Sequence, residues 1–318
     1  MATYQTYTAI GQREDLSDVI YNISPTDTPI MSSVGKAKAT AVYHEWQTDS
    51  LAAATTNNAA VEGDDATDAT MSPTTRLGNY TQIVQKTIKI SGTLDAVDKA
   101  GRKSEKAYQL AKASAEIKRD IETIISANQG RSAGNSSTAR KMGALLSWIT
   151  TNSSVGTSGA DPTTIGVSTR TDGTARSFTE TILKDVIQQV YSSGGNPKVL
   201  MVGAYQKQAV SAFAGIAAQR YMAPSNEPTT IIGAADVYMS DFGTVSVVPN
   251  RFMNSTNACD ETAFVIDPDM LAVAYLRPFA TNELAKTGDS EKTQILAELT
   301  LEVRNEAAHG IAADLAVA

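Results

Sequence analysis

The residues of this chain that come closest to a catalytic pattern are His44 and Glu45, which open the segment HEWQTD. In zinc proteases the pattern H-E-x-x-H lies on a helix, so that two histidines face one metal ion and the glutamate sits beside its bound water. Here Thr48 stands where the second histidine would be. Alternation of side chains over residues 40 to 48 also predicts a strand and not a helix. We therefore interpret His44 as a packed or hydrogen-bonded strand residue.

Two further residues could act as a base or a nucleophile: His309, near the C-terminus, and Cys259, the single cysteine. Neither histidine is accompanied by the G-x-S-x-G sequence of a serine hydrolase. The two glycine-rich motifs that bind nucleotide phosphates, G-x-x-x-x-G-K-[ST] and G-x-G-x-x-G, are also missing from the sequence. We expect no metal and no cofactor, and we interpret His309 as a surface or helix-end residue and Cys259 as an incidental thiol. The enzymatic alternative is a cytoplasmic hydrolase with a Cys259 or His44 site and a polar lid.

Length and composition indicate a folded chain of 318 residues with a formal net charge of −7. That length allows one large domain or two joined domains. The N-terminus lacks the pattern of a signal peptide, and no apolar run reaches the ~18 residues of a membrane span. One cysteine cannot form an internal disulfide framework. We therefore expect folding in a cytoplasm, no membrane contact and no binding that depends on neutralising phosphates.

The first half of the chain is predicted to hold strands, a polar stretch and a long helix. Strands are predicted over 40–48 and 79–90, and the polar stretch between them has little to bury. Loops beyond ~15 residues are uncommon in compact domains unless they serve a function, and an assembly protein has a use for one. A long helix with one apolar stripe is predicted from about 94 to 128, with a stop at Gly130.

The second half of the chain is predicted to alternate between helices and strands. Residues 178 to 280 begin with a helix that ends at Gly194 and Gly195, and a hairpin is predicted near 241–243. The chain closes with a half-buried antiparallel strand over 291–304. Together these elements predict an α+β fold.

Charge is distributed unevenly between the polar stretch and the long helix. Between Lys38 and Arg76 there is no lysine or arginine, whereas six acidic residues fall there. From Asp98 to Arg119 there are seven basic and three acidic residues. Each run could be a solvated surface, but together they suit contact between the arm of one subunit and the helix of a neighbour. The candidate contact residues are Glu62, Asp64, Asp65, Arg102, Lys103, Lys106 and Lys112.

Three segments carry a resemblance to a known family: SPTDTPIMSSVGKAKATAVYHEWQTDSLAAA (24–54), RLGNYTQIVQKTIKISGT (76–93) and FVIDPDMLAVAYLRPF (264–279). With the order of elements, which matches over nearly the whole chain, they resemble the major capsid proteins of podophages similar to Escherichia phage SU-ten. That family has the Hong Kong 97-type fold, which builds the heads of tailed bacteriophages.

The resemblance implies four parts of the chain. They are an N-terminal arm (1–55), an extended loop (56–92), a peripheral domain (93–177 and 281–318) with a spine helix (94–128), and an axial domain (178–280). The strand around HEWQTD would then be arm packing, with Trp46 as a buried anchor and a further interface candidate.

The function that the resemblance implies is structural and not enzymatic. The chain would be a major capsid protein that self-assembles into hexamers and pentamers of an icosahedral shell around the double-stranded DNA of a tailed phage. Portal and scaffolding proteins would be partners, a decoration protein could cover the shell, and the virion capsid would assemble in the host bacterial cytoplasm. A net-negative shell would let DNA slide without specific binding. The alternatives are the hydrolase and a nanocompartment shell protein of the same fold.

Overall fold

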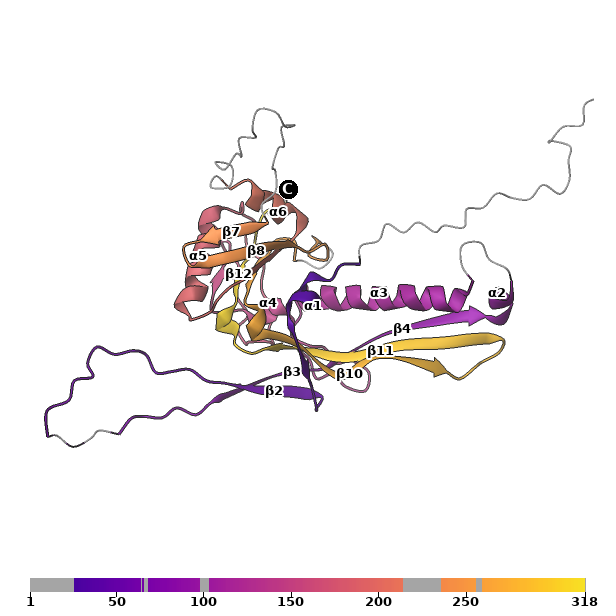
Figure 1. Cartoon of the computed structure of the whole chain (residues 1–318), viewed down its shortest axis with the longest axis horizontal. Coiled ribbons are helices and arrows are strands. Elements are labelled where there is room, and N and C mark those ends of the chain that lie inside the picture. Colours follow the sequence, from indigo (N-terminus) through magenta and orange to yellow (C-terminus); the bar gives the residue numbers. More distant parts are fainter. Residues whose placement is uncertain are drawn as a thin grey trace, which may run out of the picture.

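The structure, a computed structural model, describes residues 26–63, 65, 68–97, 103–213, 236–255 and 259–317. Figure 1 shows an elongated body built on one sheet, a compact body built on a second sheet, and a two-stranded ribbon that projects away from both. Helices and strands both contribute, as an α+β fold requires. The helices and short 3-10 turns are α1 (Pro29–Ser33), α2 (Gly92–Ala96), α3 (Glu105–Ser126), α4 (Leu145–Trp148), α5 (Glu180–Ser192), α6 (Ala204–Ser211), η3 (Pro268–Met270) and η4 (Glu306–Ala308).

The elongated body is a four-stranded sheet with α3 along one face (Figure 1). Across the sheet its strands are β1 (Gly35–Lys38), β10 (Leu271–Leu284), β11 (Ser290–Val303) and β4 (Gln82–Ser91). The last three are antiparallel neighbours, and β1 joins β10 in parallel.

The closing strand β11 is more deeply buried than its sequence predicts. The apolar side chains that alternate from Ile295 to Val303 are all buried, as expected for one face. However, Glu298, Thr300 and Glu302 of the opposite face are buried as well. Thr81 and Arg140 bind Glu298 from that side, at 2.8 and 2.5 Å. The prediction of a half-buried strand is therefore wrong for the C-terminal half of β11.

The predicted helix over 94–128 is two helices, α2 and α3. Val97 and Ser104 are both extended, so α2 ends and α3 begins within the predicted element. The cause is local, because the hydroxyl of Ser104 accepts a hydrogen bond from the amide of Ala107 and thereby starts a helix. On the buried side of α3, Ala113, Ile117, Ile121 and Ile125 pack towards the sheet at helical spacing.

The end of α3 also differs from the prediction. The helix stops at Ser126 and the next residue, Ala127, is already extended. Gly130 therefore does not terminate the helix. It lies where a Cβ atom would come within 1.9 Å of the carbonyl oxygen of Val167, so that only glycine fits beside the loop that precedes α5. Close backbone approach, and not helix termination, explains this glycine.

The compact body is a six-stranded sheet covered by α5 and α6. Its strands, in order, are β5 (Ser153–Ser154), β12 (Gly310–Ala312), β9 (Ala263–Ile266), β6 (Val199–Val202), β8 (Gly243–Pro249) and β7 (Val237–Ser240). The predicted end of α5 is confirmed, since Gly194 follows it with φ of 88°, a conformation that favours glycine. The predicted hairpin is also present, as β7 and β8 pair through Ser240 and Gly243.

Sheet membership divides the chain at positions other than those expected. The expected axial domain ended at residue 280, but β10 begins at Leu271 and pairs with β1 and β11 in the elongated body. Conversely, β5 and β12 fall within the ranges 93–177 and 281–318, yet both belong to the sheet of the compact body. The order of strands in the sequence does not reveal which sheet each strand belongs to, because a strand joins the sheet whose edge it reaches in space.

Candidate subunit interface

The ribbon consists of β2 (Tyr43–Thr48) and β3 (Thr75–Tyr80), which pair antiparallel from Tyr43–Tyr80 to Thr48–Thr75. The strand predicted over 40–48 is thus confirmed. Beyond the ribbon, the described residues of 49–74 form no helix or strand, and the segment extends away from the rest of the chain (Figure 1). We call residues 49–74 the arm tip.

Among the residues that the structure describes, none covers the large apolar side chains of the arm tip. Leu51 is 99% exposed, Met71 is 91% exposed and Val61 is 74% exposed. Single exposed apolar residues are common on protein surfaces. Here three of them lie on one segment that makes no sheet or helix with its own chain. Exposed apolar groups gathered on one segment, without cover from the described residues, are typical of a site of interaction.

The base of the ribbon, by contrast, is firmly attached. The ring centroids of Trp46 and Trp148 lie 5.4 Å apart, and Trp148 is fully buried in α4. The guanidinium carbon of Arg131 lies 5.5 Å from the centroid of the Tyr43 ring and 5.9 Å from that of Trp148. His44 Nε2 lies 3.0 Å from Glu302 Oε2 on β11. These contacts hold the ribbon in one orientation against the elongated body.

Asn79 attaches the second strand of the ribbon. Its side chain is fully buried and donates hydrogen bonds to the carbonyls of Gly143, at 3.0 Å, and Leu301, at 2.9 Å. Its Oδ1 accepts a hydrogen bond from the amide of Gly143 at 2.8 Å. No spacing in the sequence marks Asn79, because both partners lie more than 60 positions away. Sequence reasoning therefore missed it.

Some of the basic residues predicted to contact a neighbouring subunit instead contact carboxylates of their own chain. Lys106 Nζ lies 2.8 Å from Glu283 and 3.2 Å from Glu291, at the far end of the β10–β11 hairpin. Hydrogen bonds to these two carboxylates raise the pKa of Lys106. Lys112 lies 4.0 Å from Glu116. Lys103 is exposed, and Arg102 lies outside the described residues.

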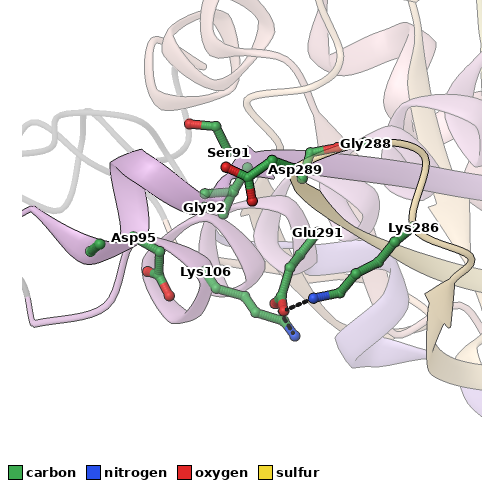
Figure 2. Close-up of a pocket in the computed structure, with 11 residues that line it drawn as sticks. Ser91, Gly92, Asp95, Lys106, Lys286, Gly288, Asp289 and Glu291 are labelled. Atoms are coloured by element: carbon green, nitrogen blue, oxygen red, sulfur yellow. Dashed lines mark hydrogen bonds and ion pairs between the residues drawn. The ribbon is translucent and has the colours of Figure 1, made fainter.

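A cavity of about 290 Å³ opens at this end of the elongated body, between α2, the start of α3 and the β10–β11 turn. Figure 2 shows that Lys106 and Lys286 both reach the carboxylate of Glu291 from different elements. Hydrogen bonds from Lys286 and Lys106 lower the pKa of Glu291. These paired charges tie the hairpin to the helix.

The acidic candidates lie on the arm tip. Glu62 and Asp65 are exposed, and Asp64 lies outside the described residues. Figure 1 places the arm tip and the start of α3 at opposite ends of the subunit. Within the described residues, one subunit therefore does not bring the acidic candidates of the arm tip together with the basic candidates near the start of α3.

The residues considered for catalysis do not form a site. Cys259 is buried, and its Sγ contacts Ser126 Oγ and the carbonyl of Phe252 at 3.9 and 3.8 Å. Burial raises the pKa of this thiol to about 11, which disfavours the reactive thiolate. His44 is bound to Glu302. Within the ranges that the structure describes, no group of three or more histidine, cysteine and acidic residues is placed to hold a metal ion.

His309 has a structural role in the compact body. It is fully buried, and its Nδ1 accepts a hydrogen bond from the amide of Asp267 at 3.3 Å. Its Nε2 lies 3.4 Å from the carbonyl oxygen of Met270. Burial lowers the pKa of His309 to about 4, so the imidazole is neutral near pH 7. The prediction of a surface or helix-end histidine is wrong as to the surface, whereas His309 does cap the end of η4.

Comparison with known proteins explains this combination of a fixed ribbon base and an uncovered tip. The model of the SU10 major capsid protein family matches residues 2–316. The major capsid protein of Escherichia phage Phieco32 is 29% identical over 97% of this chain and 96% of its own length. No helix in the described part of the chain has the length and apolar character needed to cross a bilayer.

Solved structures agree on the fold. A chain of the Cyanophage A-1(L) capsid asymmetric unit has a TM-score of 0.67 at 12% identity, with 96% of this chain and 97% of that chain covered. A chain of Gordonia phage Cozz has a TM-score of 0.65 at 11% identity, with 99% of each chain covered. These neighbours are phage capsid proteins of the Hong Kong 97 type, so the fold implied by the resemblance is confirmed.

The family match also decides between the functional alternatives. It favours a structural capsid subunit over the hydrolase and over the nanocompartment shell protein. The chain belongs to the SU10 major capsid protein family, whose members are structural proteins of the phage virion.

Proposed function

We propose that this major capsid protein closes an icosahedral shell of hexamers and pentamers by laying its arm tip over a neighbouring subunit. The observation that carries the proposal is the contrast along residues 43–80. The ribbon base is held by buried Trp148 and Asn79, while the tip exposes Leu51, Val61 and Met71. A rigid base that presents uncovered apolar groups is suited to contact with another subunit.

The two bodies take different places in this proposed shell. The elongated body, with α3 and the four-stranded sheet, would be the peripheral domain, and the ribbon would be the extended loop. The compact body would be the axial domain, grouped around the five-fold and six-fold axes. The support for these assignments is the likeness of the fold to phage capsid chains over almost their whole length.

Charge would orient the contact between subunits. The acidic arm tip, with Glu62, Asp64 and Asp65, would face the basic start of α3 in a neighbour, with Arg102, Lys103 and Lys112. Lys106 is the weakest of these candidates, because Glu283 and Glu291 of its own chain already bind it. Exposed charge pairs contribute little free energy each, so their role would be register and orientation.

Other components would complete the particle. We propose that separate portal and scaffolding proteins take part, that a decoration protein could bind the outer surface, and that assembly takes place in the cytoplasm of the host bacterium. The packaged double-stranded DNA would meet the shell without specific binding. The formal net charge of −7 supports this, because it disfavours strong attachment to phosphates.

Negative-stain electron microscopy with a sizing column tests the proposal on the purified full chain. The unmodified chain should form closed shells, tubes or capsomer rings. A variant in which residues 52–72 are replaced by a short glycine–serine linker should stay as small oligomers while keeping the thermal transition of the subunit. A second variant, Leu51→Ser with Val61→Ser and Met71→Ser, separates the apolar contacts from the length of the arm. Normal shells from both variants would refute the proposed role of the arm tip.

A further inference from the structure

The last strand of the four-stranded sheet, β4, has an open edge. β11 pairs with one side of β4, and no other strand of the described residues pairs with the second side. The amide of Gly92, just after β4, donates to the carbonyl of Asp289 at 3.3 Å. Hydrogen-bonded positions alternate along an antiparallel pair, and the register of β4 with β11 has no bulge. The backbone N–H and C=O groups of Gln85, Thr87 and Lys89 therefore point away from β11.

The residue just before β4 shows the same alternation, but there the second side is occupied. The amide of Thr81 donates to the carbonyl of Val42 at 2.9 Å, and the carbonyl of Thr81 accepts from Arg140 Nε at 2.8 Å. From residue 85 to residue 89, no hydrogen bond from the described residues reaches the outward backbone groups of β4. An unpaired strand edge is a template for one further strand.

A groove of about 430 Å³ lies beside the open edge, between β4 and α3. It is lined by residues 85–88 of the strand and by the facing side of the helix. Lys86 Nζ lies 3.1 Å from Glu116 and 3.3 Å from Asp120, and Lys112 Nζ lies 4.0 Å from Glu116. Two lysines thus face two carboxylates. The charges along the groove balance, so it suits an uncharged occupant.

We propose that residues 51–61 from the arm tip of a second copy of this chain pair with the open edge of β4 as an added strand, parallel to β4. This pairing rests on the proposed function, in which the arm tip lies over a neighbour, and it names the surface that receives the tip. The occupant comes from another copy because the arm tip and the far end of β4 lie at opposite ends of the subunit (Figure 1).

The composition of residues 51–61, LAAATTNNAAV, fits the groove. The segment contains no charged residue, no glycine and no proline, so each of its residues can donate an amide and none brings a charge into the groove. The returning half of the arm tip, residues 68–74, is less suited because it carries Asp68 and Pro73. Alanine and asparagine are depleted in strands, which agrees with the lack of regular structure over 51–61 in the single subunit.

The length of the segment matches the exposed apolar side chains at the two ends of the edge. Leu51 and Val61 are ten positions apart, which is about 33 Å in an extended strand. β4 rises about 26 Å from Ile83 to its end at the same spacing, and α2 follows with Leu94. Ile83 is 44% exposed and Leu94 is 46% exposed. In the parallel direction Leu51 would lie near Ile83 and Val61 near Leu94, and the acidic residues after Val61 would reach Lys103 at the start of α3.

Residue-resolved hydrogen exchange of the unmodified chain tests the pairing, with unassembled subunits compared with assembled shells. On assembly the amides of Gln85, Thr87 and Lys89, and alternate amides within 51–61, should slow at least about ten-fold, because each gains a partner. The other amides of β4 are bonded to β11 in both states and serve as the internal control. If residues 51–61 slow but the three outward amides of β4 do not, the arm tip covers another surface, and this pairing fails while the proposed function stands. If neither set slows, both fail.

A proline at position 87 removes one outward amide and leaves the hydrogen bonds between β4 and β11 in place. Thr87→Pro should therefore slow assembly at least about ten-fold in light scattering, while the thermal transition of the isolated subunit is retained. Thr87→Val is the matched control, because valine keeps the amide and the β-branched shape, and it should assemble at the unmodified rate. Equal assembly rates for the proline and valine variants would overturn the pairing.

Disulfide trapping gives a further readout that remains informative if the proline variant does not fold. The length match places Thr56 opposite Thr87 of the neighbour. Thr56→Cys combined with Thr87→Cys should link one chain to the next in mildly oxidised shells, and cysteines at positions 55 and 57 cover a shift of register by one residue. Thr56→Cys combined with Asn282→Cys, an exposed residue of β10, should link at least about ten-fold more slowly. The native thiol of Cys259 is buried and gives little background. The absence of links between chains at all three positions would refute the pairing.

Discussion

The indole rings of Trp46 and Trp148 lie 5.4 Å apart with an interplanar angle of 38°, and this contact joins the ribbon to the core of the elongated body. Trp46 comes from β2, whereas Trp148 lies in α4, about a hundred positions further along the chain. Trp148 is fully buried, and its Nε1 donates to the carbonyl of Gly143 at 3.3 Å. The same Gly143 binds Asn79 of β3. Both strands of the ribbon are thus attached to one short segment.

Replacing Trp46 by alanine should destabilise the subunit. The substitution removes a large, partly buried ring from its contact with Trp148, and we expect a loss of about 2–4 kcal/mol in the free energy of unfolding. Denaturant unfolding of the unassembled subunit measures it. Leu51→Ala is the control, because Leu51 is 99% exposed and should change the free energy by less than about 0.5 kcal/mol. Equal losses for the two variants would contradict the anchoring role of Trp46.

Removal of the Glu122 carboxylate should release α1. Its oxygens accept hydrogen bonds from the amides of Ile30 and Met31 and from Asn250 Nδ2, at 2.8 Å for the last. Glu122→Ala leaves these buried donors without an acceptor, and we expect a loss of about 3 kcal/mol or more in the free energy of unfolding.

Glu122→Gln should have a smaller effect than Glu122→Ala, because one oxygen remains as an acceptor. Burial raises the pKa of Glu122, so the neutral amide also relieves the cost of a buried charge. Hydrogen exchange at residues 28–34 reads out the release of α1. Glu116→Gln, on the same helix but in solvent contact, is the control. If alanine and glutamine at position 122 behave alike, the hydrogen bonds to α1 do not carry the effect.

Acid should destabilise the compact body through His309. The pKa of His309 is lowered to about 4 from an ordinary value near 6.5, chiefly because burial disfavours the charged imidazole. The stabilising contribution is therefore complete above pH 6.5 and is lost as the pH falls from 6.5 to about 4. The shift corresponds to about 3 kcal/mol.

The free energy of unfolding measured from pH 8 to pH 4 checks this dependence. His309→Gln keeps a neutral polar side chain and should remove the part of the slope that lies between pH 6.5 and 4. The remaining dependence of the free energy of unfolding on pH comes from carboxylates, among them Glu298. Burial raises the pKa of Glu298, but hydrogen bonds from Thr81 and Arg277 outweigh burial and lower it. An unchanged slope in the His309→Gln variant would show that His309 does not contribute.

The thiol of Cys259 should be almost inert in the folded chain. A rise of the pKa from 9.0 to about 11 lowers the thiolate fraction at pH 8 about 100-fold, and burial slows access of the reagent further. Labelling with a thiol reagent should therefore be at least ~100-fold slower in the native subunit than in guanidinium. Rapid native labelling would reopen the question of a reactive site at Cys259.

Exchange of charges should test the proposed contact between subunits. Lys103→Glu with Lys112→Glu should impair assembly at low salt without changing the unfolding of the isolated subunit. Adding Glu62→Lys and Asp65→Lys to the same chain should restore assembly, because the pairs are then complementary again. Light scattering during assembly measures both effects. If the quadruple variant assembles no better than the double variant at Lys103 and Lys112, these residues do not face each other.

Local signals in the sequence were sufficient for many elements. The alternation around His44 predicted β2, the stripe through Ile117 and Ile121 predicted the buried face of α3, and Gly194 marked the end of α5. These features depend on neighbours a few positions apart, such as backbone dihedral preferences and helical or strand periodicity. The same periodicity could not locate the break between α2 and α3, since both helices fit one continuous pattern.

Contacts between residues far apart in the sequence decided the features that local signals could not predict. Sequence alone left His309 as a surface or helix-end residue, β11 as half-buried and residues 271–280 with the compact body. Contacts with distant segments decided the burial of His309 and of β11 and the sheet that residues 271–280 join. Asn79, Glu122 and Arg131 carry no local pattern, because their partners lie tens to more than two hundred positions away. Burial and hydrogen bonding depend on which surfaces meet in three dimensions. The sequence by itself determined the α+β class, the order of elements and the resemblance to a capsid family; only the tertiary structure decided which side chains attach the ribbon and which groups remain open to a partner.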